Sequence, residues 1–174
     1  MELQRRGSVK NFKKTGVIFV TMAVAFGVPA GAVAYAADDP KQVVKYRKSV
    51  MKAQLAHFQA IKAIVRGKVG FTGLLANHAK ALDLTGKGLT DLFPAGTGAD
   101  KIKTRAKPEI WRDWKKFEAG AQKLSAETAK LVKIANGGDM KAFAVQYKAV
   151  GKACAACHKP FRAKKKRKKR KKRN

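Results

Sequence analysis

Two thiols and an imidazole lie close together near the carboxyl end of the chain. Cys154 and Cys157 are the only cysteines among 174 residues, and His158 follows directly. On a helix, residues three apart lie on the same face, about one turn from each other. Such a group could form a disulfide, exchange electrons as a dithiol, ligate a metal, or attach a prosthetic group.

Three of these uses fit the sequence poorly. A disulfide across so short a loop would constrain little of the unfolded chain. A thioredoxin-like pair opens a helix after a strand, and no β–α–β pattern is present. A tetrahedral zinc site needs four ligands, and the other two histidines, His57 and His78, have no ligand-like spacing to this cluster.

The remaining use satisfies every constraint. C-x-x-C-H is the attachment signature of c-type haem, in which two thiols form thioethers with the porphyrin vinyl groups and the histidine ligates iron on the proximal side. We therefore predict one haem c per chain, attached through Cys154 and Cys157, with His158 as the proximal iron ligand.

Helical periodicity dominates the segments that must position this site. A first helix is predicted from Asp38–Pro40 to about Gly67, because apolar residues recur at steps of three and four. A weaker second segment runs from about Phe71 to Phe93, and Gly86 and Gly88 make its second half doubtful. The composition of the next sixteen residues, from Phe93 to Pro108, predicts a long loop.

Two further helices complete the predicted fold. The third opens at Pro108 and carries an apolar stripe to Ala135 without a break, until "NGGD" stops it. The fourth places Phe143, Cys154, Cys157 and Phe161 on one stripe. We predict an all-α fold, an antiparallel four-helix bundle with covalently attached haem, over residues 37–163.

The amino terminus predicts export. Residues 1–14 carry five basic side chains and one acid, and no charge follows from Thr15 to Ala37. The sequence "AYA" at residues 34–36 supplies the small residues that signal peptidase needs before its cut. Residues 1–36 are therefore predicted to be a cleaved signal peptide, with a retained anchor as the alternative. The predicted location is the periplasm of a bacterium.

The net charge is +29, and the mature chain keeps 35 basic and 10 acidic residues, or +25. Ten of these charges form one run, Lys164–Arg173, and residues 164–174 are predicted to be a disordered basic tail. Because exported proteins seldom meet nucleic acid, we predict no nucleic-acid partner. Three alternatives remain for the run: a solvated tail, a contact with an anionic membrane surface, or a contact with an acidic protein.

From Pro40 to Arg162 the sequence resembles the class II cytochromes c, which comprise cytochrome c′ and the low-spin cytochromes c-556. The resemblance rests on "VKYRKS", "AHF", "KPEIW" and "VGKACAACHKPFR". The haem motif near the carboxyl end is the most specific of these, since class I cytochromes c carry it near the amino terminus. The resemblance implies a left-handed four-helix bundle with haem between the helices, often as a homodimer.

The resemblance also implies roles for three more residues. Met51, four residues after Arg47, occupies the distal position, where gas-binding cytochromes c′ have a non-ligating residue and cytochromes c-556 have a methionine ligand. The resemblance favours Met51 as the sixth iron ligand, although a lone methionine on an apolar stripe is more often an ordinary core residue. Arg47 is expected near a haem propionate and Arg162 near the proximal face. Phe161 replaces the family's usual Tyr, and Pro160 could bend or end the helix early.

These patterns predict a monohaem electron carrier and not an enzyme, because no acid–base or nucleophile constellation is present. With His158 and Met51 both ligating, iron would be saturated and suited to electron transfer with a redox partner, which the basic chain predicts to be acidic. The alternative is a five-coordinate cytochrome c′ that binds NO or CO. From a different class comes a basic adhesion module for anionic lipid or acidic partners, with haem absent or incidental.

Overall fold

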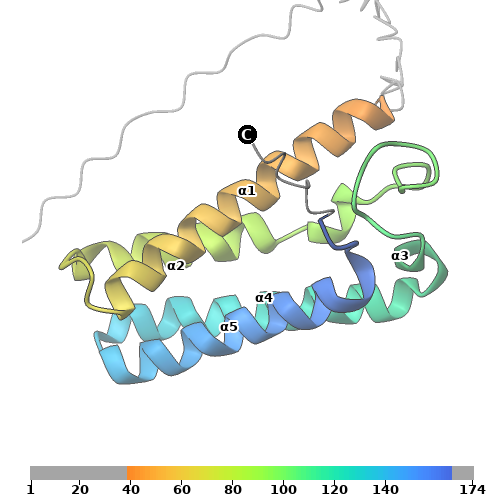
Figure 1. Ribbon diagram of the computed structural model, residues 1–174. Helices are drawn as coiled ribbons and strands as arrows, with labels where there is room; N and C mark the ends of the chain where they lie inside the picture. The colour runs from red at the N-terminus through yellow and green to blue at the C-terminus, as the bar shows by residue number, and fades with distance from the viewer. Residues whose placement is uncertain (1–38, 166–174) are drawn as a thin grey trace, which may run out of the picture. The chain divides into compact units, whose positions relative to one another are not determined.

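A computed structural model describes residues 39–165, and these residues form a helical bundle (Figure 1). The chain order is α1 (Pro40–Val65), η1 (Thr72–Leu74), α2 (Leu75–Gly86), η2 (Leu89–Leu92), α3 (Glu109–Arg112), α4 (Trp114–Gly137) and α5 (Met140–Phe161). Between residues 39 and 165 the only β-type pairing is one isolated bridge. The predicted all-α bundle of four long helices is therefore confirmed, whereas the predicted signal peptide and most of the basic tail lie outside the described residues.

Local signals set the start of α1 and the boundary between α4 and α5 where the sequence predicted them, whereas α2 covers only Leu75–Gly86 of the predicted second segment. Asp39 caps α1, because its side chain accepts a hydrogen bond from the backbone N–H of Lys41 at 2.9 Å. Gly138, with φ of 75°, ends α4 in the left-handed conformation that glycine adopts without strain. Asp139 then caps α5, because its carboxylate accepts from the backbone N–H groups of Lys141 and Ala142. Short connections of this kind make neighbouring helices antiparallel.

The prediction of an unbroken third helix from Pro108 to Ala135 is wrong at Asp113. There the backbone leaves the helical region, with φ of −122° and ψ of 57°, and separates α3 from α4. The break turns α3 toward the preceding loop, where Ile110 is buried and the Trp111 indole N–H donates to the carbonyl of Phe93 at 3.0 Å. Trp114, expected on the apolar stripe, is partly exposed as a result.

The core has two parts, and the side chains of Met51 and Leu92 pack against both of them. α4 packs against α2 and α5, and α1 packs against α2, whereas α1 and α5 approach each other at few points. The larger apolar cluster lies between the four long helices, and the smaller one gathers the loop, α3 and the end of α5. Met51 packs against both clusters. The smaller cluster consists of Phe93, Ala106, Ile110, Phe117 and Phe161.

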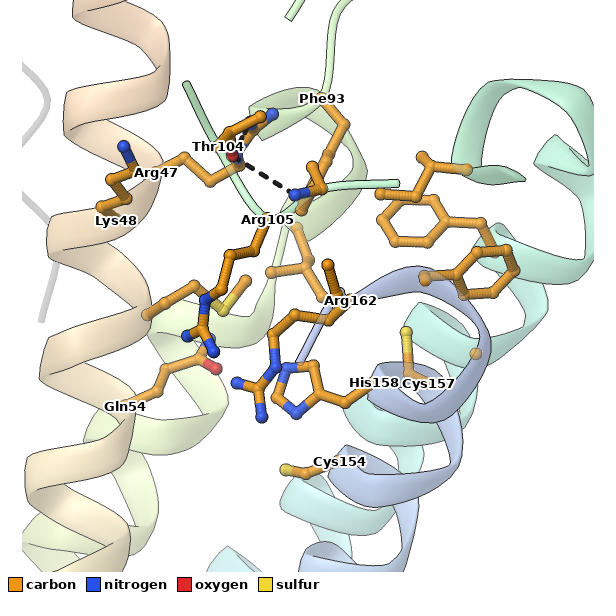
Figure 2. Close-up of a pocket in the computed structure, with 18 of the residues that line it drawn as sticks. Arg47, Lys48, Gln54, Phe93, Thr104, Arg105, Cys154, Cys157, His158 and Arg162 are labelled. Atoms are coloured by element: carbon orange, nitrogen blue, oxygen red, sulfur yellow. Dashed lines mark hydrogen bonds between the residues drawn. The ribbon is translucent and has the colours of Figure 1, made fainter. Parts of the chain in front are cut away.

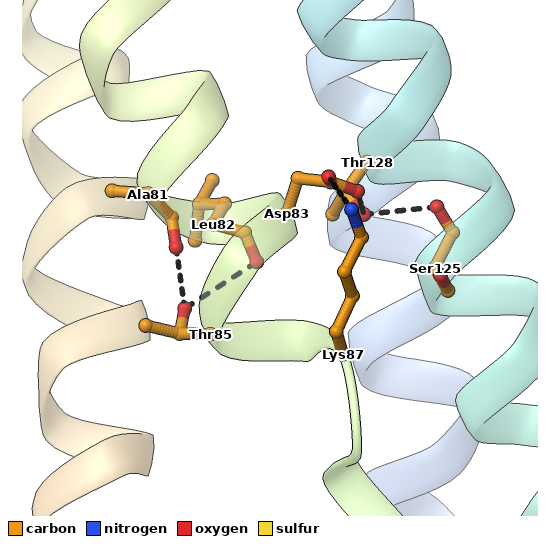
Figure 3. Close-up of polar contacts among 7 residues, drawn as sticks. All are labelled: Ala81, Leu82, Asp83, Thr85, Lys87, Ser125 and Thr128. Carbon is orange, nitrogen blue, oxygen red and sulfur yellow. Dashed lines mark hydrogen bonds and ion pairs between the residues drawn. The ribbon is translucent and has the colours of Figure 1, made fainter. Parts of the chain in front are cut away.

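A polar contact ties α2 to α4 inside this core (Figure 3). Thr128 is 1% exposed, and its hydroxyl lies 3.0 Å from both the Asp83 carboxylate and the Ser125 carbonyl. The other carboxylate oxygen of Asp83 lies 3.2 Å from the Lys87 ammonium. Because the buried hydroxyl always has an acceptor within reach, this polar group fits an otherwise apolar seam.

Candidate haem site

A cavity of about 820 Å³ opens between α1, α4, α5 and the loop before α3. Cofactor pockets usually measure roughly 300–1,000 Å³ and are mainly apolar. Figure 2 shows Cys154, Cys157 and His158 on α5, across the cavity from Gln54 on α1. The apolar wall consists of Met51, Leu55, Leu89, Phe93, Ala106, Ile110, Phe117, Leu124 and Phe161.

Cys154 and Cys157 are protonated thiols and His158 is a neutral imidazole, the forms needed before haem attachment and iron ligation. Both cysteines are free thiols, and burial raises the pKa of Cys154 and of Cys157. Burial, followed by the nearby charges of Arg162 and Arg105, lowers the pKa of His158 to about 4. His158 is therefore a neutral imidazole near pH 7, which is the form that ligates a metal.

Space beside the cysteines also suits a bulky planar group. Gly120 of α4 lines the cavity, and a β-carbon at this position would lie 3.4 Å from the Cys157 sulfur. A larger side chain would fill the room next to that sulfur. Two thiols, one neutral imidazole and a mainly apolar cavity of this volume therefore fit a covalently attached haem.

Arg47 lines the cavity, but its guanidinium forms hydrogen bonds with the loop that follows α2. It is 3% exposed, and it donates to the carbonyls of Leu92 and Thr97 and to the hydroxyls of Thr97 and Thr104, at 2.9 to 3.3 Å. It also lies over the Phe93 ring at 4.4 Å. Burial lowers its pKa. The expected contact with a propionate stays a prediction, and the structure gives Arg47 a second role in holding the loop.

Replacing Arg47 with Lys should therefore destabilise the protein although the charge is kept. A lysine ammonium cannot present the several N–H donors that the planar guanidinium presents, so at least two buried acceptors lose their donor. Each lost hydrogen bond costs about 1–3 kcal/mol of folding free energy. We expect a loss of about 2–4 kcal/mol in denaturant unfolding of the haem-loaded protein. The same change at exposed Arg112 is the control and should shift stability by less than about 0.5 kcal/mol. Equal, small shifts would show that Arg47 does not hold the loop.

Arg162 lines the cavity beside His158, and the sequence analysis missed its companion, Arg105 (Figure 2). The backbone explains how Arg105 reaches this place. Ala106 pairs with Arg162 in the isolated bridge, and the N–H of Ala163 donates to the carbonyl of Arg105 at 2.8 Å. The Lys107 ammonium donates to the carbonyl of Pro160 at 2.9 Å. The loop thus clamps the last turn of α5, which continues past the proline to Phe161.

The comparison with protein families decides what this site is. The family model described as Cytochrome C′ matches residues 42–162. The chain belongs to the cytochrome c′ family. It is 37% identical over 127 residues to cytochrome c′ of Rhodospirillum rubrum, covering 73% of this chain and 86% of that relative. It is 29% identical to cytochrome c-556 of Agrobacterium fabrum, covering 84% of this chain and 95% of the relative.

Solved structures agree with this family. The crystal structure of cytochrome c′ from Rubrivivax gelatinosus superposes with a TM-score of 0.68 at 28% identity, covering 74% of this chain and all of that one. A nitric oxide complex of a cytochrome c′ variant from Alcaligenes xylosoxidans gives 0.68 at 27% identity, with 75% and 100% coverage. The resemblance to class II cytochromes c is confirmed, and the cofactor of this cytochrome c′ family member is haem c.

The two remaining histidines meet each other away from the haem cavity. His57 of α1 and His78 of α2 lie 3.0 Å apart between their Nδ1 atoms, and neither lines the cavity. One ring must donate and the other accept, so the contact requires at least one neutral imidazole. Between residues 39 and 165, no group of three or more metal-ligating side chains is found.

This histidine pair predicts a loss of stability in mild acid. Burial, followed by the charge of His57, lowers the pKa of His78. As pH falls below about 6.5, the unfolded chain therefore binds a proton that the folded chain resists, and stability decreases. Replacing His78 with Gln in the haem-loaded protein should flatten this decrease between about pH 7 and pH 5 in urea unfolding. An equal slope in both proteins would contradict the assignment.

Proposed function

We propose that this protein is an exported monohaem cytochrome of the c′ family that binds NO or CO at five-coordinate iron. In this proposal Cys154 and Cys157 attach the haem, His158 is the proximal ligand, and Met51 covers the distal face without ligating. When bound, haem supplies an iron atom that can change its oxidation state and take a small diatomic ligand. Burial, followed by the charges of Arg162 and Arg105, lowers the pKa of His158 and keeps its imidazole neutral.

The observation that carries this proposal is the packing of Met51. Its side chain contacts both apolar clusters, as a core residue would, while it lines the haem cavity from α1. Nearby, the Gln54 amide donates to the carbonyl of Thr85 at 2.9 Å and is therefore already engaged. A distal side built from Met51 and Leu55 offers small neutral ligands an apolar environment. The relatives include a cytochrome c′ variant solved with nitric oxide bound.

A second candidate is the electron carrier in which Met51 is the sixth ligand. It is favoured by the Met51 thioether on α1, which lines the same cavity as His158 on α5, and by the similarity to cytochrome c-556. His/Met ligation saturates iron and excludes gases.

Replacing Met51 with Leu separates the two candidates, because Leu keeps the approximate volume but cannot ligate. If Met51 is only a cover, the spin state and the affinity for CO change little, and this is the expected result. A change from a low-spin to a high-spin spectrum would instead identify Met51 as a ligand. The haem-loaded protein is used in both optical spectra and CO titrations.

Export remains part of the proposal, because residues 1–36 lie outside the described residues. No helix between residues 39 and 165 is long and apolar enough to cross a bilayer. A homodimer likewise stays a prediction.

A further inference from the structure

Four lysines follow one face of α1 at successive turns. Together with Lys103 of the loop they line a groove of about 290 Å³ between α1 and that loop. All five side chains are exposed. We call this feature the lysine groove; it consists of Lys41, Lys45, Lys48, Lys52 and Lys103.

The lysine groove is unfavourable for the helix that carries it. Like charges three or four residues apart on a helix destabilise it by about 0.2–0.5 kcal/mol per pair. Lys41 also lies in the first turn, where the helix dipole disfavours a positive charge. No ion pair between residues 39 and 165 involves any of the five. The carboxylate of Asp39 instead caps the helix backbone. The hydrogen bond from Lys48 to the carbonyl of Lys103 is the one compensation between residues 39 and 165. Departures from helix rules of this kind are typical of functional surfaces.

The groove is continuous with the mouth of the haem cavity. Lys48, Lys52 and Lys103 line both spaces. In Figure 2 the Lys48 side chain extends away from the cavity. Its ammonium donates to the carbonyl of Lys103 at 3.0 Å. Further positive side chains on the cavity lining are Arg105, Arg162, Lys164 and Lys165. A negatively charged partner drawn to the groove is thereby brought to the haem.

We propose that the lysine groove docks the acidic surface of a one-electron donor protein that reduces the haem of this cytochrome. The donor loses one electron and ferric iron becomes ferrous, with no bond or proton transferred. The inference rests on the proposed function, since CO binds ferrous iron, and it applies equally to the electron carrier. A concave groove beside the redox centre accepts projecting carboxylates, whereas a lipid headgroup layer is flat and gains nothing from being near the haem. These features favour a protein partner.

The test is the rate at which anionic ferricyanide oxidises the ferrous, haem-loaded full chain. The groove variant changes Lys45, Lys48, Lys52 and Lys103 to Gln. The control variant changes four exposed lysines on α4 and α5 to Gln, so its net charge falls by the same amount. These lysines line neither the groove nor the haem cavity: Lys123, Lys133, Lys141 and Lys148. The basic tail is present in every protein and affects all of them alike.

We expect the groove variant to react at least about fivefold more slowly at low salt and the control less than about twofold more slowly. Raising the ionic strength to about 1 M, where the Debye length is about 3 Å, should bring the rates together. Cationic hexaammineruthenium(III) should react faster with the groove variant. Poly-L-glutamate should inhibit the ferricyanide reaction of wild type and control, but not that of the groove variant.

Equal slowing of both variants would overturn the proposal, because it would show an effect of net charge alone. Loss of binding to phosphatidylglycerol vesicles in the groove variant, with an unchanged ferricyanide rate, would also overturn it and assign the groove to a membrane. Failure of the proposed function is seen separately, as wild-type protein that does not bind CO. The reduction potentials of wild type and both variants are measured as well, and the rates are compared at equal driving force, because Lys48, Lys52 and Lys103 line the haem cavity.

Discussion

Replacing both Cys154 and Cys157 with Ala will abolish covalent attachment of haem, and replacing either one will leave a single thioether at most. The two sulfurs are the only thiols in the chain and both line the haem cavity. The check is haem retained by the chain after denaturation, measured by mass spectrometry. The control is Ala156→Ser, an exposed change between the cysteines that should leave attachment intact. Covalent haem on the double variant would contradict the site.

The double cysteine variant should also lose most of its cooperative stability. A single Leu→Ala cavity costs about 2.7–5 kcal/mol. A cavity of about 820 Å³ between α1 and α5 is far larger than the volume such a substitution removes, and these two helices make few direct contacts. We expect the haem-free chain to keep helical circular dichroism but to lose a sharp urea transition. A transition as sharp as that of the loaded protein would show that the bundle does not depend on haem.

Replacing Met51 with Ala should raise the rate of CO association with the ferrous protein by at least about tenfold. Met51 lines the cavity from α1, so its truncation removes the side chain that covers the distal face in the proposed function. The measurement is stopped-flow CO binding, and the control is Met140→Ala at the start of α5, which lines neither space. An unchanged rate would remove Met51 from the path of the gas.

Local sequence signals predicted the helices well because helix ends depend on neighbouring residues. Asp39, Gly138 and Asp139 each act on backbone groups within a few residues of themselves. The break at Asp113 escaped prediction because the three- and four-residue spacing from Ile110 through Trp114 to Phe117 continues across it. What turns the chain there is packing against Phe93, which lies 18 residues from Trp111 in the sequence.

The sequence predicted the parts of the site that belong to the C-x-x-C-H motif or to the spacing of Arg47 and Met51 on α1. Cys154, Cys157, His158, Met51 and Arg162 all line one cavity, as the predicted bundle requires.

Three other placements depend on tertiary contacts. Arg105 was missed because a backbone bridge to α5, rather than a sequence pattern, brings it there. The burial of Arg47 depends on a loop about 50 residues away. The contact of His57 with His78 joins two helices whose spacing alone shows no pairing.

The most direct test is the optical spectrum of the matured wild-type protein, ferric and dithionite-reduced, before and after CO. Five-coordinate iron beneath a non-ligating Met51 predicts a high-spin reduced spectrum that CO shifts. A low-spin reduced spectrum that CO leaves unchanged would contradict this account and assign Met51 to the iron of an electron carrier.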